Sequence, residues 1–244
     1  MSRPFLILQL RPEDDTSDNE FSAILKYSGL DAADTHRIRI EKNGIPDDLV
    51  IENYSGIIVG GSPFDISTPA GKKTEIQKKI EADFRRLFDV VIPNDIPFLG
   101  ACSGNGLLGS YLGTNISNQY GEAVGCVTLD ITDQGKLDPL LSGFPDQIDV
   151  MLGHKEACDS LPRGATLLMT GYACPVQMFR VGNNVYATQF HPEADSRVFE
   201  TRVKVYKDKG YFPPSDADRI IEFCHQQDVR VPGRILKNFV DAYR

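Results

Sequence analysis

The sequence predicts an α/β fold: an open, mostly parallel sheet flanked by helices, with a smaller mixed or antiparallel β element in its second half. Short β-rich apolar runs alternate with longer segments of helical periodicity, a pattern typical of parallel sheets with crossover helices. After Gly121 the strand candidates follow one another closely, separated by Gly, Pro and Asn, which indicates a meander. The composition, 41% hydrophobic and 25% charged, is that of an ordinary globular chain and excludes wholesale disorder.

The first half of the chain alternates strands and helices. Four buried strands are expected, at residues 5–10, 36–40, 56–59 and 96–99, each ended by Gly, Pro or a charged residue. Helices are expected at residues 19–27 and 73–90. In the second helix Ile76, Ile80, Phe84 and Leu87 recur at three- and four-residue steps and form an apolar face. The acidic run of residues 13–15, followed by Asp18, is interpreted as a solvated loop.

The second half predicts closely spaced strands and then a helical tail. The expected strands cover residues 123–131, 147–152, 165–169, 176–181 and 185–189. The tail, residues 196–244, is expected to be helical, with helices at 219–227 and 233–243. No repeat or Gly/Ser linker interrupts the sequence. We therefore expect one domain over residues 1–244, with 196–244 as a helical C-terminal extension.

Charge and hydropathy exclude two classes of partner. The net charge is −8 and the pI is about 5.0, the wrong sign for a surface that neutralises nucleic-acid phosphates. No stretch approaches the roughly 18 apolar residues of a membrane helix, and the first residues have no small-residue cleavage site. We expect a cytoplasmic protein that binds neither nucleic acid nor membrane.

The cysteines and histidines do not form a metal-binding pattern. The 5 cysteines are odd in number and none has a Cys-x-x-Cys spacing, so neither a disulfide framework nor a zinc knuckle is indicated. The 4 histidines are widely separated and show no His-Glu-x-x-His spacing. Free thiols and no metal are expected.

The segment Pro-Phe-Leu-Gly-Ala-Cys-Ser-Gly-Asn-Gly-Leu-Leu, residues 97–108, carries the most informative motif. It predicts a buried strand, a tight Gly-x-Cys-x-Gly turn and the start of a helix, which is the pattern of a nucleophile elbow. Gly100 and Gly104 permit the sharp turn that lifts Cys102 clear of the sheet. At a helix N-terminus the macrodipole favours thiolate over thiol. The alternative is a small buried cysteine packed in a glycine-rich turn.

A second motif, Gln-Phe-His-Pro-Glu at residues 189–193, follows the last strand candidate. Side chains alternate along an extended chain, so His191 and Glu193 project to the same side about 6.5 Å apart, and the carboxylate can hold the imidazole. Pro192 biases His191 toward extended geometry. With a cysteine, such a pair can take the thiol proton and later protonate a leaving amine. The alternative for His191 alone is a solvated histidine at a strand end.

Together these residues resemble the class I (triad) glutamine amidotransferases, in particular stand-alone glutaminase domains of the GMP synthase kind. The family has a Gly-x-Cys-x-Gly-x-Gln elbow, followed later in the chain by His-Pro-Glu. Residues 57–63, 150–154 and 174–179 resemble its Gly-rich loop, its middle histidine segment and the strand facing that segment. The resemblance runs from about residue 50 to residue 193 and implies a flavodoxin-like sheet.

The resemblance implies a reaction that needs no cofactor. In the family a cysteine attacks the side-chain amide of glutamine, a γ-glutamyl thioester forms, ammonia leaves, and water releases glutamate. By the match, Cys102 is the nucleophile, His191 the general acid and base, and Glu193 the residue that orients the imidazole.

The tetrahedral intermediate of this reaction needs N–H donors aimed at its oxyanion. The candidates are the N–H of Ser103, which follows the nucleophile, and an N–H from Gly61 or Ser62. A plain turn after a strand is the alternative for Gly60 and Gly61. A phosphate loop is disfavoured, because no Gly-x-x-x-x-Gly-Lys-Ser/Thr pattern follows.

The sequence departs from the family where the substrate is expected to bind. Gly106 stands where the family has the Gln that contacts bound glutamine, so either another side chain fills that space or the pocket accepts a larger group. Gly153, His154, Lys155 and Glu156 stand where the family has Ser-His-Gly-Asp. These residues are expected to contact the α-amino and carboxylate groups of the substrate, and His154 is interpreted as structural rather than catalytic.

Three functions follow as hypotheses. The first is hydrolysis of the γ-glutamyl amide of glutamine, with ammonia released to solvent or to an acceptor on a separate synthetase subunit. The second is hydrolysis of γ-glutamyl conjugates or peptides without ammonia transfer, which Gly106 favours. The third is a non-catalytic binding or regulatory module. A peptidase or chaperone of the related elbow-containing type is disfavoured, because its early acidic partner is replaced by residues 9–11, Gln-Leu-Arg.

The tail contains an aromatic segment whose role the sequence leaves open. Tyr206, Tyr211 and Phe212, with the pair Pro213 and Pro214, indicate a packed excursion. It either covers the site or forms the contact of a homodimer.

Overall fold

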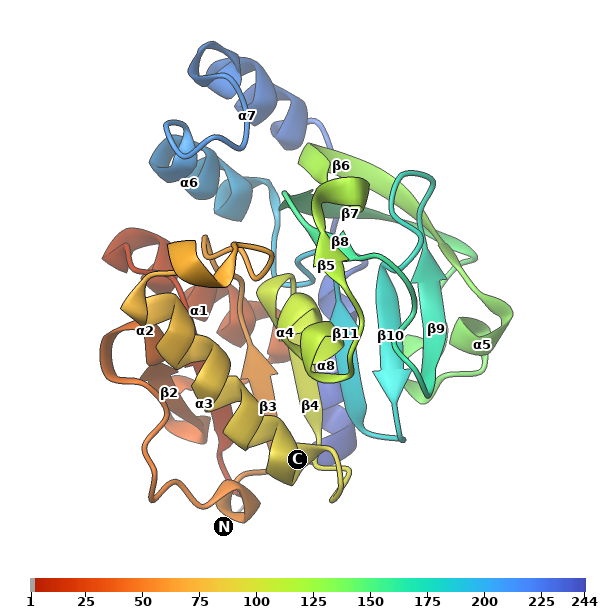
Figure 1. Cartoon of the computed structure of the whole chain (residues 1–244). Helices are drawn as coiled ribbons and strands as arrows, with labels where there is room; N and C mark the ends of the chain where they lie inside the picture. The colour runs from red at the N-terminus through yellow and green to blue at the C-terminus, as the bar shows by residue number, and fades with distance from the viewer. Residues whose placement is uncertain (1–2) are drawn as a thin grey trace.

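The computed structural model describes residues 3–244 and centres on a nine-stranded sheet of order β2-β1-β3-β4-β11-β10-β9-β6-β7 (Figure 1). Neighbouring strands in the first half of this sheet are parallel. These strands are β1 (Phe5–Gln9), β2 (Thr35–Arg39), β3 (Gly56–Val59), β4 (Phe98–Ala101) and β11 (Val185–Thr188). Their places agree with the sequence prediction, with shifts of at most two residues for β4 and one for the others.

The second half of the sheet is antiparallel. It consists of β10 (Met178–Val181), β9 (Ala165–Thr170), β6 (Glu122–Ile131) and β7 (Gln147–His154). Strand β11 pairs in parallel with β4 and antiparallel with β10, so it joins the two halves into one continuous sheet. A separate two-stranded sheet pairs β5 (Ile116–Ser117) with β8 (Ala157–Cys158). The predicted fold class is confirmed, and the expected antiparallel element continues the parallel sheet.

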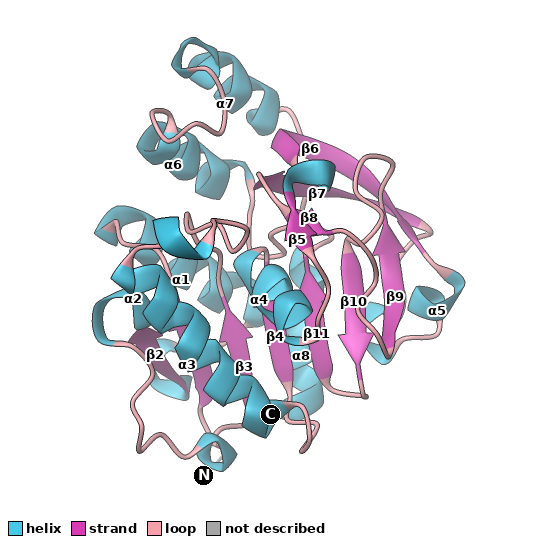
Figure 2. Cartoon of the chain, in the orientation of Figure 1, coloured by secondary structure: helices cyan, strands magenta, loops and turns pink. Residues whose placement is uncertain are grey.

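Helices cover both faces of the parallel half (Figure 2). On one face lie α1 (Asp14–Ser28) and α8 (Gly233–Tyr243), and on the other lie α3 (Glu75–Val91) and α4 (Ser103–Tyr111). Because side chains alternate along a strand, Phe5 and Ile7 of β1 join a core with α1 and α8, whereas Leu6 and Leu8 join one with α3. Each such fully buried side chain stabilises the fold by about 1.5–3 kcal/mol.

Helix α1 begins earlier than the sequence predicted. The acidic residues interpreted as a loop form its first turn, with Asp14 and Asp15 at the positive end of the helix dipole. The Asp14 carboxylate lies 2.6 Å from both Arg39 and Lys42. The side chain is solvated, as expected, but the backbone is helical.

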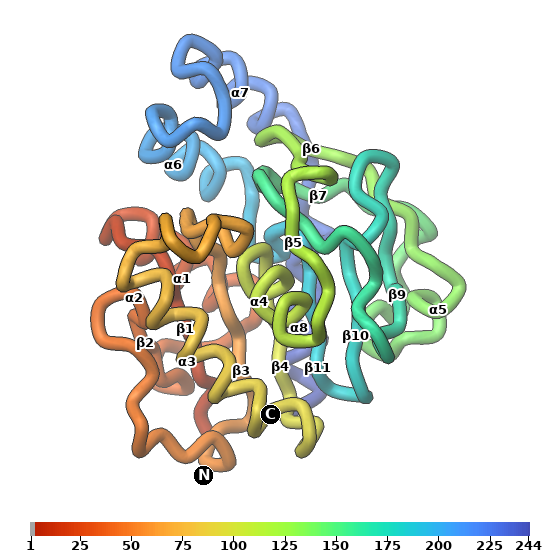
Figure 3. Tube along the Cα trace, viewed as in Figure 1, coloured from red at the N-terminus to blue at the C-terminus, as the bar shows by residue number. Residues whose placement is uncertain are grey.

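The tail forms α6 (Ser196–Tyr206), α7 (Ala217–His225) and α8, and these are the helices of a region that the sequence predicted to be helical. Asp195 caps α6 by accepting hydrogen bonds from two amides of its first turn, and it also accepts from Lys26 and Tyr27 of α1. Figures 1 and 3 show α6 and α7 above the end of the sheet where β3 ends. This is the edge at which open α/β sheets bind their ligands. Short helices α2 (Ile40–Asn43) and α5 (Asp133–Lys136) complete the α-helices of the described residues.

Within residues 3–244, no helix combines the length and the apolar character that a membrane crossing requires.

Candidate active site

Cys102 occupies a strained turn between β4 and α4. Its φ is 52°, in the left-handed region that side chains other than glycine rarely adopt, and its amide donates to Thr188 of β11 at 2.7 Å. Gly100 must be glycine here, because a Cβ would lie 2.9 Å from the Cα of Gly104. The turn has the strand-turn-helix geometry expected of a nucleophile elbow.

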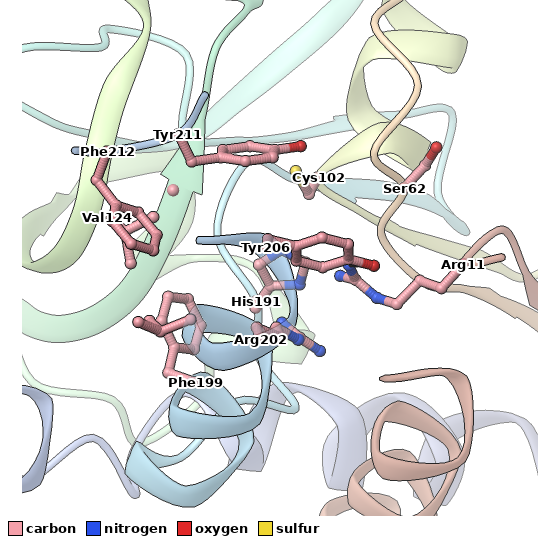
Figure 4. A pocket seen from close by; sticks show the side chains of 12 residues that line it. Arg11, Ser62, Cys102, Val124, His191, Phe199, Arg202, Tyr206, Tyr211 and Phe212 are labelled. Atoms are coloured by element: carbon pink, nitrogen blue, oxygen red, sulfur yellow. Dashed lines mark hydrogen bonds between the residues drawn. The ribbon is translucent and has the colours of Figure 1, made fainter. Parts of the chain in front are cut away.

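His191 and Glu193 form a buried pair just after β11. His191 Nδ1 lies 2.9 Å from Glu193 Oε1, and the two residues are only 4% and 2% exposed. Cys102 and the His191 ring line the same cavity (Figure 4). No hydrogen bond joins the Cys102 sulfur to the ring within residues 3–244. Catalytic hydrogen bonds often tighten only when substrate binds.

A third residue, Arg202 of α6, contacts this pair and was not predicted from the sequence. Its Nη2 atom donates to the same Glu193 oxygen at 2.6 Å and lies 3.5 Å from Glu20 Oε1. Glu20 in turn accepts from Arg11 at 2.7 Å. The result is a buried chain of charges of alternating sign beside Cys102.

Burial sets the protonation states of the site. It raises the pKa of Cys102 to about 12, although Arg11 and Arg202 oppose the shift. Burial and Arg202 also lower the pKa of His191, against the effect of Glu193. Burial alone would raise the pKa of Glu193, but His191 and Arg202 hold it well below its usual range. These shifts favour a thiol at Cys102, a neutral imidazole at His191 and a carboxylate at Glu193, and they oppose the thiolate that the helix N-terminus favours.

The Gly61 amide already donates to a carboxylate, which counts against it as a donor to an oxyanion. Gly61 N–H donates to Glu20 Oε1 at 3.0 Å. Gly61 instead provides space, because a Cβ there would lie 2.6 Å from His191 Cε1 and 2.5 Å from Arg11. Ser62 and Ser103 remain as candidates, and the Ser103 hydroxyl lies 3.5 Å from the Ser62 carbonyl.

A polar cavity of about 350 Å³, including its mouth to solvent, opens on one side of Cys102. It gathers every residue predicted for substrate contact, although they come from distant parts of the chain. These residues are Gly106, Gly153, His154, Lys155 and Glu156. Asp65 and Gln189 complete its polar wall.

Another side chain fills the space beside Gly106, the first of the two expectations for this position. A Cβ at Gly106 would lie 2.7 Å from the terminal carbon of Ile66. The Glu156 carboxylate fixes the loop that carries Ile66, because it accepts from the amides of Ile66 at 2.6 Å and Ser67 at 2.8 Å. Burial raises the pKa of Glu156, while these amide hydrogen bonds oppose the shift. Glu156 therefore shapes the cavity through this loop.

Both ring nitrogens of His154 are engaged. Nε2 lies 3.0 Å from Glu122 Oε2 and Nδ1 lies 3.0 Å from the Glu156 carbonyl. Gln177 donates to the same Glu122 oxygen at 2.6 Å. This arrangement agrees with the structural interpretation of His154.

Two groups of side chains have the composition of metal ligands, but neither favours an ion. Glu122, His154 and Cys174 bring ligand atoms within 4.8 Å of one another. Their hydrogen bonds already satisfy the carboxylate and imidazole, and burial raises the pKa of Cys174 to about 12, against the thiolate that a metal needs. The other group, Glu20, His191 and Glu193, is neutralised by the two buried arginines.

A second cavity, of about 430 Å³ including its mouth, adjoins the polar cavity at Cys102. The tail supplies much of its wall through Phe199, Val203, Tyr206, Tyr211 and Phe212 (Figure 4). The aromatic excursion therefore covers the site, which is one of the two roles expected for it.

Known proteins resemble this chain along most of its length. The family model described as glutamine amidotransferase class-I matches residues 19–205. A protein of Sulfurisphaera tokodaii, named as one subunit of a glutamine-hydrolyzing GMP synthase, is 30% identical over 184 residues, which cover 75% of this chain and 86% of that protein. Gamma-glutamyl peptidase 3 of Arabidopsis thaliana is 24% identical over 185 residues, covering 73% and 70% of the two chains.

Solved structures share the fold. A glutamine amidotransferase from Thermotoga maritima superposes with a TM-score of 0.77 at 21% identity, covering 100% of this chain and 99% of that chain. A protein from Thermoplasma acidophilum, described as a GMP synthase subunit, gives a TM-score of 0.62 at 18% identity, covering 99% and 94%.

Proposed function

The chain belongs to the class I glutamine amidotransferase family, and on this basis we propose that it hydrolyses the γ-amide of glutamine or of a related γ-glutamyl compound through Cys102. The observation that carries the proposal is Cys102 on its strained turn, in one cavity with His191, whose ring is paired with the buried Glu193. Relatives in the family are named for glutamine hydrolysis and for γ-glutamyl peptidase activity.

In the first step, neutral His191 takes the thiol proton as the Cys102 sulfur attacks the γ-carbonyl carbon. The raised pKa of Cys102 makes this transfer necessary, because the free thiol does not ionise near neutral pH. Glu193 stabilises the imidazolium that forms and fixes its tautomer through Nδ1. The imidazolium then protonates the departing amine, the carbon–nitrogen bond breaks, and a γ-glutamyl thioester remains.

In the second step, His191 deprotonates a water molecule that attacks the thioester. The carbon–sulfur bond breaks, glutamate leaves, and the sulfur recovers its proton. The backbone N–H groups of Ser62 and Ser103 are the proposed oxyanion donors in both steps, and loss of one such donor costs about 3–4 kcal/mol. These steps need no cofactor.

The fate of the amine distinguishes two candidate functions. If the amine is ammonia, we propose that its acceptor lies on a separate protein chain, since several relatives are named as one subunit of a GMP synthase, which implies a partner for them. If the amine is larger, the chain is a hydrolase of γ-glutamyl conjugates. The second candidate is favoured by the second cavity next to Cys102.

Glutamate release with and without Cys102 tests the proposal. The parent protein, Cys102→Ala and the matched control Cys126→Ala are each incubated with glutamine and with γ-glutamyl peptides. We expect the parent and Cys126→Ala to release glutamate and Cys102→Ala to release none. Equal release by Cys102→Ala would exclude Cys102 as the nucleophile, and no release by the parent would favour the non-catalytic alternative.

A further inference from the structure

Two cavities of different character meet at Cys102. They share Ser62, Cys102, Gly153 and Tyr211. The polar cavity is lined by charged and amide side chains, including Asp65, Lys155 and Glu156.

The walls of the second cavity are apolar. Its lining side chains include Val124, Phe199, Val203, Tyr206, Tyr211 and Phe212. Arg11 and Arg202 also reach it, but each is paired with a buried carboxylate, at 2.7 Å and 2.6 Å. Nε and Nη1 of Arg202 make no hydrogen bond within the described residues, but both arginines have an acidic partner, and apolar side chains form most of the lining.

The wall supplied by the tail is anchored from two sides. The Tyr206 hydroxyl lies 3.3 Å from Arg11 and donates to Glu13 at 3.2 Å. On the other side, Lys155 donates to the Lys209 carbonyl at 3.1 Å, and its ammonium lies 4.3 Å from the centre of the Tyr211 ring. The apolar cavity is therefore a built part of the fold.

The position of His191 indicates which cavity holds the amine of a substrate and which holds its γ-glutamyl part. His191 lines the apolar cavity and must reach the departing nitrogen to protonate it. The amine therefore leaves on the apolar side. The γ-glutamyl part, with its α-amino and α-carboxylate groups, lies on the side of Lys155 and Glu156.

We propose that the substrate is a γ-glutamyl amide whose amine carries an apolar group that packs against the aromatic lining of the apolar cavity. This inference rests on the proposed function. Cys102 forms a bond to the γ-carbonyl carbon, the carbon–nitrogen bond breaks, and the amine leaves with a proton from His191. Water then cleaves the thioester to glutamate. Ammonia carries no apolar group that could contact this lining.

Three substrates test the inference on the parent protein: glutamine, γ-glutamylglycine and γ-glutamylphenylalanine. The two peptides differ only in the benzyl side group. We expect kcat/KM for glutamate release to be about 10- to 100-fold higher for γ-glutamylphenylalanine than for γ-glutamylglycine. Equal values, or a preference for glutamine over both peptides, would overturn the inference and leave the proposed function intact. No glutamate from any of the three would overturn the proposed function.

A matched pair of variants locates the side group. Phe212→Ala removes part of the apolar wall, and Phe223→Ala removes a 44% exposed aromatic ring of α7 outside the cavity. We expect Phe212→Ala to lower the ratio of kcat/KM for γ-glutamylphenylalanine to kcat/KM for γ-glutamylglycine by about tenfold. Phe223→Ala should match the parent. An unchanged substrate preference in folded Phe212→Ala would overturn the assignment of the cavity.

Discussion

Two buried histidines, His191 and His154, each lie beside a glutamate, at 2.9 Å and 3.0 Å, yet only one of them belongs to the proposed catalytic group. In His154 both nitrogens bond to the protein. In His191 only Nδ1 does so among the described residues, and its ring lines the cavity that contains Cys102. Burial and a carboxylate partner are common to both, so neither feature identifies an acid–base catalyst. An acid–base catalyst is identified instead by a ring nitrogen without a protein partner, which is Nε2 of His191 among the described residues.

The largest contrast is expected from the same substitution at both positions. His191→Gln should lower kcat/KM for γ-glutamyl amide hydrolysis by about 10⁴-fold or more, because the thiol loses its base. His154→Gln should retain activity within about tenfold, because no proposed step uses it. Steady-state glutamate release measures both. Comparable losses in the two variants would remove the distinction between the pairs.

Arg202 distinguishes the environments of the two pairs, since it contacts Glu193. Its loss should misplace the imidazole and lower kcat/KM by about 100-fold. Arg202 also lowers the pKa of His191, so Arg202→Gln should raise that pKa and move the acid limb of the pH–rate profile to higher pH. The charged neighbours that remain around His191 are Glu193, Glu20 and Arg11, and Arg202→Lys restores the positive charge.

The lysine variant is the control for charge against geometry. It should return the acid limb toward its parental position even if kcat/KM stays low, because the guanidinium fork is lost. An acid limb at the same pH in all three proteins would show that Arg202 has only a structural role.

The main effect of replacing His154 should be a lower stability of the fold. His154→Gln breaks a network that joins Glu122 of β6, Glu156 and Gln177, so buried polar groups lose partners. The free energy of unfolding should fall by about 1–3 kcal/mol. Urea unfolding at neutral pH measures the change. A parental unfolding midpoint would mean that the network contributes nothing to the fold.

The smallest effect is a pH dependence of stability. The pKa of His191 is lowered from its ordinary value of 6.5, so the unfolded chain binds a proton that the native ring does not. This contribution to stability is present above the ordinary value and is lost as the pH falls through it. The parent should therefore lose stability between about pH 7 and pH 5 more steeply than His191→Gln. Parallel curves from urea unfolding would contradict the lowered pKa.

Local sequence predicted much of the fold and brought the central residues to notice. Strand β3 lies where a short apolar run indicated a strand, and helix α8 lies where helical periodicity indicated a helix. The elbow around Cys102 can be predicted from its glycines. The N-terminus of α1 was missed because acidic residues favour a solvated loop and a first helical turn alike. Such a run carries no periodic signal.

Side-chain contacts between different elements of the fold could not be predicted from local sequence patterns. Arg202 pairs with Glu193 across a turn, and Gly61 N–H is taken by Glu20, 41 positions away in sequence. Ile66 fills the space beside Gly106 only because the loop that carries it folds over the elbow. The raised pKa of Cys102 follows from burial, which no motif states.

The most direct measurement is covalent labelling with a glutamine-mimicking electrophile, followed by peptide mapping. Burial raises the pKa of all five cysteines, so an unassisted thiol has little thiolate at neutral pH. If His191 activates Cys102, the label should appear at Cys102 alone, be blocked by a γ-glutamyl substrate, and be lost in His191→Gln but not in His154→Gln. Labelling spread over all five thiols, or unchanged at Cys102 in His191→Gln, would contradict the account.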